Sequence, residues 1–226
     1  MPTYDDGAVH RFLDSVLFGS GAGPSISDAF LLNSHILESI QRASLEQDAK
    51  AVHPVSFLDM FVWNNPAARL PNAGVADDFG VINGATGFGT NGLSLNTVDV
   101  KALGATNVYL RFTYVLPRNY DPGNDVEVRL KSAGMLTTVA DTSATADVEA
   151  FEMNGAAGIG TDLCTTAATT INSLTLADKV FVISAGGLLP GDMLDIRVNY
   201  ALNDAASGTV VQGFIGMVQM LLDSRG

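Results

Sequence analysis

Residues 192–203 read DMLDIRVNYALN, and this stretch decides how the rest of the chain is interpreted. One large apolar residue stands at every second position: Leu194, Ile196, Val198, Tyr200 and Leu202. Successive side chains of a β-strand leave opposite faces, so this alternation predicts a strand with one buried face. Residues 108–116 and 126–131 repeat the pattern, and three such strands must share a core. The C-terminal two-thirds is therefore predicted to be a β-sandwich or barrel.

Strand patterns separated by turn residues continue through residues 76–226. We expect strands at 79–82, 87–90, 93–97, 106–116, 125–131, 135–140, 146–153, 162–171, 179–184, 192–203 and 209–223. The last stretch is apolar on both faces, which indicates a strand covered on both sides. No helical pattern alternates with the strands, as a parallel sheet would require. We predict an all-β jelly-roll β-sandwich of about eight or more antiparallel strands over residues 76–226.

The first part of the chain has a different pattern. Over residues 1–55 the apolar side chains recur at helical spacing, on either side of a glycine-rich hinge at residues 19–23. We therefore predict an α-helical N-terminal arm over residues 1–55, followed by an apolar connector over residues 56–75. The arm could pack on its own β domain or lie across a neighbouring subunit, and the sequence leaves both arrangements open.

The charge balance excludes several classes of partner. The chain carries 24 acidic and 12 basic residues, a formal net charge of −12, without a basic cluster. Nucleic acids and anionic membranes need such clusters, so neither partner is expected. Apolar stretches end well short of the ~20 residues of a membrane-spanning helix, and no secretory signal is expected from the acidic N-terminus. Charged residues make up only 16% of the chain, against about 25% in typical soluble domains, which favours contact with copies or a partner.

The residues that could carry chemistry do not form a recognisable catalytic or metal-binding pattern. A single cysteine, Cys164, excludes an internal disulfide and a multi-cysteine zinc site. His10, His35 and His53 all lie in the arm, and none has a second histidine at i+4. The motif GFGTNG at residues 87–92 matches a dinucleotide fingerprint, but a strand pattern follows it where a helix is required.

The carboxylates also favour a structural interpretation. Asp147 and Glu149 share one strand face and are expected to face solvent, whereas a glycosidase acid needs burial to raise its pKa. The turn at residues 121–125 contains oxygen ligands but lacks the spacing of a calcium loop. We therefore expect no catalytic residue, no cofactor and no metal site, and we expect that the protein is not an enzyme.

Three segments carry a resemblance to a known family. They are FTYVLPRNYDPGNDVEVRLKSAGMLTTVADTSATADVEAF at residues 112–151, TTAATTINSLTLAD at residues 165–178 and LLPGDMLDIRVNY at residues 188–200. These segments resemble the bodies of tailed-bacteriophage virion proteins known as capsid decoration, or cement, proteins. The resemblance is one of general sequence character and covers residues 76–223. The resemblance implies a jelly-roll structural protein of the virion, commonly a homotrimer, bound to the major capsid protein on the outer surface of the capsid.

A decoration protein must hold neighbouring capsid subunits together, and an apolar arm can extend its contact area. We expect the subunit and capsid contacts to come from eight apolar residues: Phe12, Leu13, Phe30, Ile36, Ile40, Phe57, Phe61 and Trp63. Two alternatives stay open. One is a host-attachment or glycan-binding jelly-roll module, for which Tyr120 beside Asp121 is the loop pair found. The other is a capsid protein that forms a shell by itself.

Overall fold

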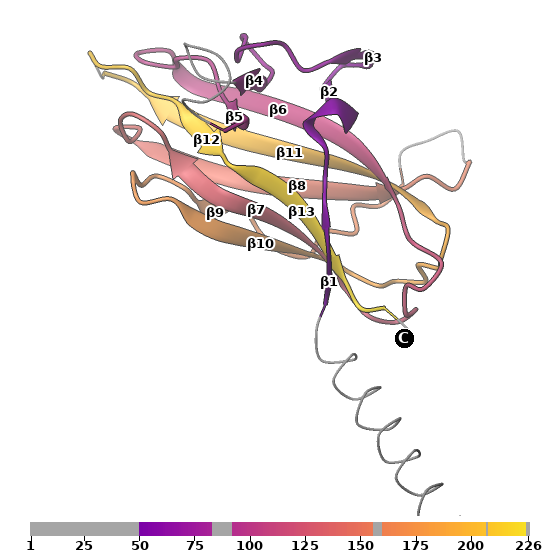
Figure 1. The fold of residues 1–226 in the computed structure, drawn as a ribbon. Coiled ribbons are helices and arrows are strands. Elements are labelled where there is room, and N and C mark those ends of the chain that lie inside the picture. The colour runs from indigo at the N-terminus through magenta and orange to yellow at the C-terminus, as the bar shows by residue number, and fades with distance from the viewer. Residues whose placement is uncertain (1–49, 83–91, 156–159, 207, 225–226) are drawn as a thin grey trace, which may run out of the picture. The chain divides into compact units, whose positions relative to one another are not determined.

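The computed structural model describes residues 50–82, 92–155, 160–206 and 208–224, which form two packed β-sheets (Figure 1). Residues 50–225 separate from the preceding residues as one compact unit. The predicted helical arm therefore lies outside the described residues up to position 49, together with its glycine hinge. The same holds for five of the expected contact residues: Phe12, Leu13, Phe30, Ile36 and Ile40.

One sheet has six strands in the order β3-β2-β6-β11-β8-β9. Their bounds are Asn65–Arg69 for β3, Met60–Val62 for β2, Gly104–Val115 for β6, Met193–Asp204 for β11, Ser143–Glu152 for β8 and Thr169–Thr170 for β9. The stretch DMLDIRVNYALN supplies β11, which pairs antiparallel with β6 on one side and β8 on the other. The predicted alternation is confirmed, because its five large apolar residues are all buried.

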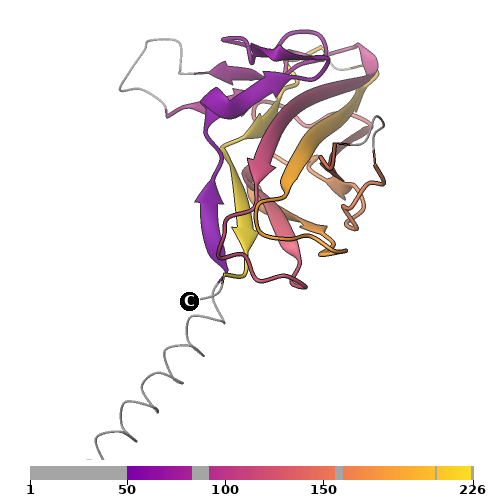
Figure 2. The same cartoon turned by 90° about the vertical axis from the view of Figure 1, so that its right-hand side faces the viewer.

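The second sheet has seven strands. Six follow the order β1-β13-β7-β12-β5-β4, and β10 pairs with β7 off this path. Their bounds are Ala51–Pro54 for β1, Met217–Leu222 for β13, Val126–Met135 for β7, Gly213–Ile215 for β12, Ser94–Asn96 for β5, Gly80–Ile82 for β4 and Ala177–Ile183 for β10. Pairing between all these strands is antiparallel. The expectation of an all-β sandwich of antiparallel strands is thus confirmed, and its two layers are seen from a second side in Figure 2.

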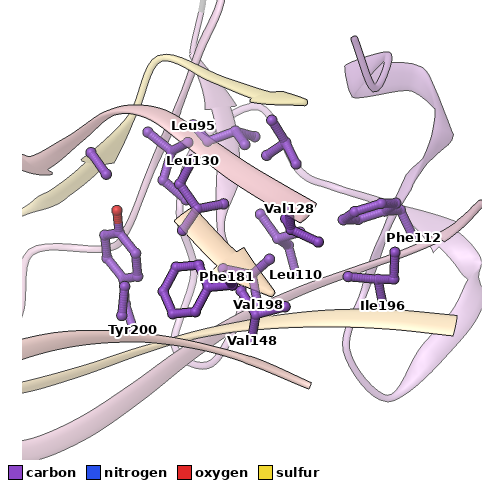
Figure 3. Close-up of a cluster of buried hydrophobic side chains, with 14 of the residues drawn as sticks. Leu95, Leu110, Phe112, Val128, Leu130, Val148, Phe181, Ile196, Val198 and Tyr200 are labelled. Atoms are coloured by element: carbon purple, nitrogen blue, oxygen red, sulfur yellow. The ribbon is translucent and has the colours of Figure 1, made fainter. Parts of the chain in front are cut away.

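The core lies between the two sheets (Figure 3). Phe112 and Val198 come from the six-stranded sheet, while Leu130 and Phe181 come from the seven-stranded sheet, and all four are fully buried. Burial of each such side chain contributes about 1.5–3 kcal/mol relative to exposure. Tyr200 adds a polar link across the core, since its hydroxyl donates a hydrogen bond of 3.0 Å to the carbonyl of Phe214 in β12.

The sandwich begins earlier than the sequence predicts. Strands β1, β2 and β3 and a short 3-10 helix, η1 (Phe57–Asp59), belong to the body, so its start is Ala51 and not residue 76. The strands here are too short to show alternation, and Pro and Asn interrupt them. They form because β1 pairs with β13 and β2 pairs with β6, which are contacts with distant residues.

Other strand predictions differ in their bounds. Of residues 135–140 only Met135 is in a strand, and of residues 162–171 only Thr169–Thr170. The predicted strand at 209–223 is two strands, β12 and β13, separated at Gly216. The predicted strand at 87–90, inside the glycine motif, lies outside the described residues. Glycines and threonines near these bounds give alternating patterns in loops as well as in strands, which explains the errors.

Candidate functional site

The outer face of the six-stranded sheet carries an unusual set of side chains. Antiparallel pairing aligns the outward residues of β6, β11 and β8 in rows, each named here after its β11 member. The Asn199 row contains Tyr109, Asn199 and Asp147; the Arg197 row contains Arg111, Arg197 and Glu149; and the Asp195 row contains Thr113, Asp195 and Phe151. Consecutive rows are two residues, or about 7 Å, apart along the strands. The three rows thus form a continuous surface.

The chain's only tryptophan lies against this surface. Trp63 follows β2 directly, and its backbone N–H donates a hydrogen bond of 2.8 Å to Asp78 Oδ1. The indole stacks on the ring of Tyr109, with a centroid distance of 4.6 Å and an angle of 18° between the planes. Both residues remain half-buried, so the stacked pair is fixed and still partly open to solvent.

Arg197 extends this stack toward the next row. Its guanidinium carbon lies 4.8 Å from the ring centroid of Trp63 and 4.6 Å from that of Phe151. Such contacts stabilise the position of the cation by about 0.5–2 kcal/mol each. The contacts connect Tyr109, Trp63, Arg197 and Phe151 in that order, and they join strands that are distant in sequence.

Asp195 holds the two arginines of the face. Its side chain is 7% exposed and lies 2.6 Å from Arg111 Nε and 3.4 Å from Arg197 Nη2. A carboxylate this buried is stable only when paired and hydrogen-bonded. Two buried polar atoms nearby, Arg197 Nε and Asn199 Oδ1, have no hydrogen-bond partner among the described residues. The face therefore combines well-fixed charges with two buried polar atoms that lack a hydrogen-bond partner among the described residues.

The remaining carboxylates make the face slightly acidic. Burial raises the pKa of Glu149; Arg197 lowers it, while Asp162 and Asp147 raise it further. Asp162 Oδ1 accepts hydrogen bonds of 2.9 Å from the backbone N–H groups of Ala150 and Cys164, which fixes it beside β8. With two arginines facing four carboxylates, the face has a formal excess of two negative charges. An anionic ligand would be repelled at this surface.

The structure separates the three expected contact residues that it describes. Phe61 pairs in register with the outward-facing Arg111, so Phe61 and Trp63 both lie on the outer-face side of the sheet. Phe57 packs instead against the hydrophobic core and lines a cavity of about 500 Å³. The connector is therefore divided between core packing and the outer face.

The other sequence candidates have structural explanations. The expectation that Tyr120 forms an exposed loop pair is wrong, because Tyr120 is fully buried and its hydroxyl donates a hydrogen bond to the Asn124 carbonyl. Burial raises the pKa of the Cys164 thiol to about 11, so the thiol is protonated at neutral pH. His53 packs edge-on against Tyr114, and His10 and His35 lie outside the described residues.

The sequence shows several members of the outer face but not that they lie together. The alternation of residues 192–203 predicts only that Arg197 and Asn199 face away from the buried side, and the alternation of residues 108–116 predicts the same of Tyr109 and Arg111. The signal in the sequence is the type of outward residue, because side chains with planar groups, Tyr, Arg and Asn, recur at the outward positions of both strands. Among the described residues, no group of three or more His, Cys, Asp or Glu is arranged to hold a metal ion, and no helix is long and apolar enough to cross a membrane.

No protein-family model and no curated protein matches the sequence. Solved structures that align with part of this chain include a carbohydrate-binding module, TmCBM61, in complex with β-1,4-galactotriose (TM-score 0.40, 9% identity, 64% of this chain and 82% of the other). A second is the xylan-binding module CBM15 (TM-score 0.37, 13% identity, 78% of this chain and 99% of the other). A third is the enzymatically active domain of tailspike protein 4 of bacteriophage CBA120 (TM-score 0.36, 13% identity, 65% of this chain and 18% of the other).

Proposed function

We propose that the protein is a carbohydrate-binding β-sandwich that holds an oligosaccharide on the outer face of its six-stranded sheet and does not cleave it. The observation that carries the proposal is the half-buried stack of Trp63 on Tyr109, continued by Arg197 and set in register with Asn199 and Asp147. This arrangement places aromatic surface beside amide, guanidinium and carboxylate groups on a rigid sheet.

The chemistry of sugars matches both parts of this surface. The C–H groups of a sugar ring pack against aromatic side chains, and its hydroxyls both donate and accept hydrogen bonds. Asn199 offers both kinds of partner, while carboxylates accept and the guanidinium donates. Because the outer face has an excess of negative charge, we propose that neutral glycans are preferred over glycans that carry uronic or sialic acids.

A direct test uses Trp63, whose fluorescence reports on this face alone because the chain has no other tryptophan. A glycan array followed by fluorescence and calorimetric titration should identify neutral oligosaccharides that bind. Arg197→Gln and Asn199→Ala should each weaken the binding at least about tenfold, the value of one lost hydrogen bond to a charged or buried group. Mass spectrometry of the bound glycan should show no cleavage products.

Arg129→Gln is a matched control. Arg129 lies in β7 of the seven-stranded sheet, and its Nε is buried without a hydrogen-bond partner among the described residues, as in Arg197. We expect this variant to bind glycans as the wild type does. Equal binding by all three variants would contradict the assignment of the outer face, and an array without any neutral ligand would contradict the function.

A second candidate function is the capsid decoration role that the sequence resemblance implies, with a homotrimer on the outer surface of a major capsid protein shell. Three exposed apolar side chains on the outer side of the seven-stranded sheet favour it: Val52 at 49%, Val180 at 37% and Met217 at 38% exposure. Such side chains are suited to contacts with a subunit. Phe12, Leu13, Phe30, Ile36, Ile40, Phe57, Phe61 and Trp63 remain the proposed contact set.

The two functions are separable by experiment. Deletion of residues 1–49 should abolish capsid binding if the arm carries the contacts, whereas glycan binding by the outer face should persist. Wild-type capsid occupancy by the truncated protein would refute the decoration role. Particles that form from the purified protein alone would instead indicate the third alternative, a shell-forming capsid protein.

A further inference from the structure

One end of the outer face is apolar. Val115 at the end of β6 pairs in register with Met193 at the start of β11, and the backbone N–H of Met153 donates a hydrogen bond of 2.8 Å to the Met193 carbonyl. Val115, Met193 and Met153 are 53%, 38% and 49% exposed. These three residues form the Met193 row, which follows the Asp195 row on the same face of the same strands.

The Met193 row continues the candidate site and is not an isolated patch. It lies two residues, or about 7 Å, beyond Asp195 and Phe151 along the strands. The face therefore changes in chemistry from the amide and carboxylate of the Asn199 row, through the Arg197 row and Phe151, to three exposed apolar side chains. A ligand that lies along the strands would meet polar groups first and apolar groups last.

The position of the Met193 row at the end of the sheet indicates which part of a ligand it would contact. Met193 begins β11, Val115 ends β6 and Met153 follows the end of β8, so the row marks the end of the sheet. A terminal group of a ligand fits there better than an internal one. Two methionines also suit a hydrocarbon chain, because the thioether side chain is flexible and polarisable and adapts to irregular apolar surfaces.

We infer that the oligosaccharide bound by this face carries an apolar aglycone, an alkyl chain at its anomeric end, and that the Met193 row holds this chain. The inference rests on the proposed function and specifies its ligand class. The sugar would occupy the Asn199 and Arg197 rows beside Trp63, while the chain would cross Phe151 and end over Met153 and Met193. Burial of part of an alkyl chain there would add affinity that a free sugar lacks.

The test compares hexyl with methyl β-glycosides of glucose and galactose, followed by calorimetry and by Trp63 fluorescence. We expect the hexyl glycoside of the preferred sugar to bind about tenfold more tightly than the methyl glycoside, which corresponds to burial of about two methylene groups. In the double variant Met153→Ser/Met193→Ser the two affinities should become equal. The methyl glycoside should bind as it does to the wild type.

Met217→Ser is the matched control, because Met217 has the same 38% exposure as Met193 but belongs to β13 of the other sheet. This variant should keep the hexyl advantage. Equal binding of hexyl and methyl glycosides to the wild type would overturn the inference, as would an advantage that survives in the double variant. A wild-type oligomer that the double variant dissociates would also overturn it, since a second copy would then cover the row.

If the protein does not bind glycans at all, the same experiments give a different result. In that case neither the glycosides nor any array glycan would change the fluorescence of Trp63 or release heat. Binding of array glycans without a hexyl advantage would leave the glycan-binding function in place and remove only the apolar aglycone.

Discussion

Asp195 accepts two hydrogen bonds from the guanidinium group of Arg111, with Nε 2.6 Å from Oδ1 and Nη2 2.8 Å from Oδ2. The two residues are 84 positions apart and meet because β6 and β11 pair antiparallel. The same carboxylate lies 3.4 Å from Arg197 Nη2. A single buried carboxylate thus fixes the two arginines of the outer face, so the stability of the sheet and the geometry of the candidate site are coupled.

Removal of this carboxylate should be costly. Asp195→Ala leaves Arg111 and Arg197 half-buried without their shared partner, at 25% and 13% side-chain exposure. Loss of one partner from a fully buried pair costs about 3–5 kcal/mol, and we expect about 2–3 kcal/mol here because the arginines are partly solvated. Urea unfolding measures the change. A triple replacement, Asp195→Leu with Arg111→Met and Arg197→Met, should recover part of the lost stability, because the buried carboxylate and both of its arginine partners are removed together. Recovery should be incomplete, because Glu149 then loses the favourable charge of Arg197.

Tight packing against Tyr200 gives a second prediction. A Cβ atom added at Gly213 would lie 2.6 Å from Tyr200 Cδ2 and 3.1 Å from Thr97 Cγ2. Tyr200 cannot move easily, because it is fully buried and hydrogen-bonded to the Phe214 carbonyl. Gly213→Ala should therefore lower the free energy of unfolding by about 1–3 kcal/mol.

Gly186→Ala is the control for this packing argument. The nearest atom to a Cβ at Gly186 is a carbonyl oxygen 3.8 Å away, an ordinary contact distance. We expect a change below about 0.5 kcal/mol, as for most exposed positions. Equal destabilisation by the two substitutions would show that the contact with Tyr200 does not determine the cost.

The sequence contains enough information to predict the sandwich but not its limits. Strands β6, β8 and β11, and the first part of β7 up to Lys131, are long and alternate, so burial of one face identifies each of them. The shorter strands depend on pairing with distant residues, as β1 does with β13. Gly216 illustrates the remaining difficulty, because the apolar run 209–223 does not show which of its two glycines, Gly213 or Gly216, interrupts the strand.

The candidate site was less predictable than the fold, for a physical reason. Each row combines one residue from β6, one from β11 and one from β8, so the rows depend on the register of two strand pairs. A shift of one residue would turn every one of these side chains to the other face. Trp63 is a further case, since its stacking on Tyr109 depends on where β2 ends. A single sequence shows the residue types but not these alignments.

Glu149 provides a prediction about pH. Burial raises its pKa in the folded protein, Arg197 partly offsets this, and Asp162 and Asp147 add to the increase. In the unfolded chain the pKa of a glutamate is about 4.3. Because the pKa of Glu149 is higher in the folded protein, ionisation of Glu149 lowers the free energy of unfolding at pH values above about 4.3. Glu149→Gln should therefore be slightly more stable than the wild type at pH 7. Urea unfolding at a series of pH values should show this difference disappear as the pH falls below about 4, and a difference that grows on acidification would contradict the argument.

The edge strand β1 gives the last prediction, which concerns where the body begins. All four residues of β1 pair with β13, from Ala51 opposite Leu222 to Pro54 opposite Gln219, and Lys50 Nζ lies 2.6 Å from Glu127 Oε1 in β7. A chain that starts at Lys50 should therefore unfold in one cooperative transition. A chain that starts at residue 56 should be less stable than that chain by about 2–4 kcal/mol, because it loses the ladder hydrogen bonds and uncovers apolar surface beside β13. Urea unfolding of the two truncated chains measures the difference directly. Equal stability would show that β1 is dispensable and that the folded body does not need the residues before position 56.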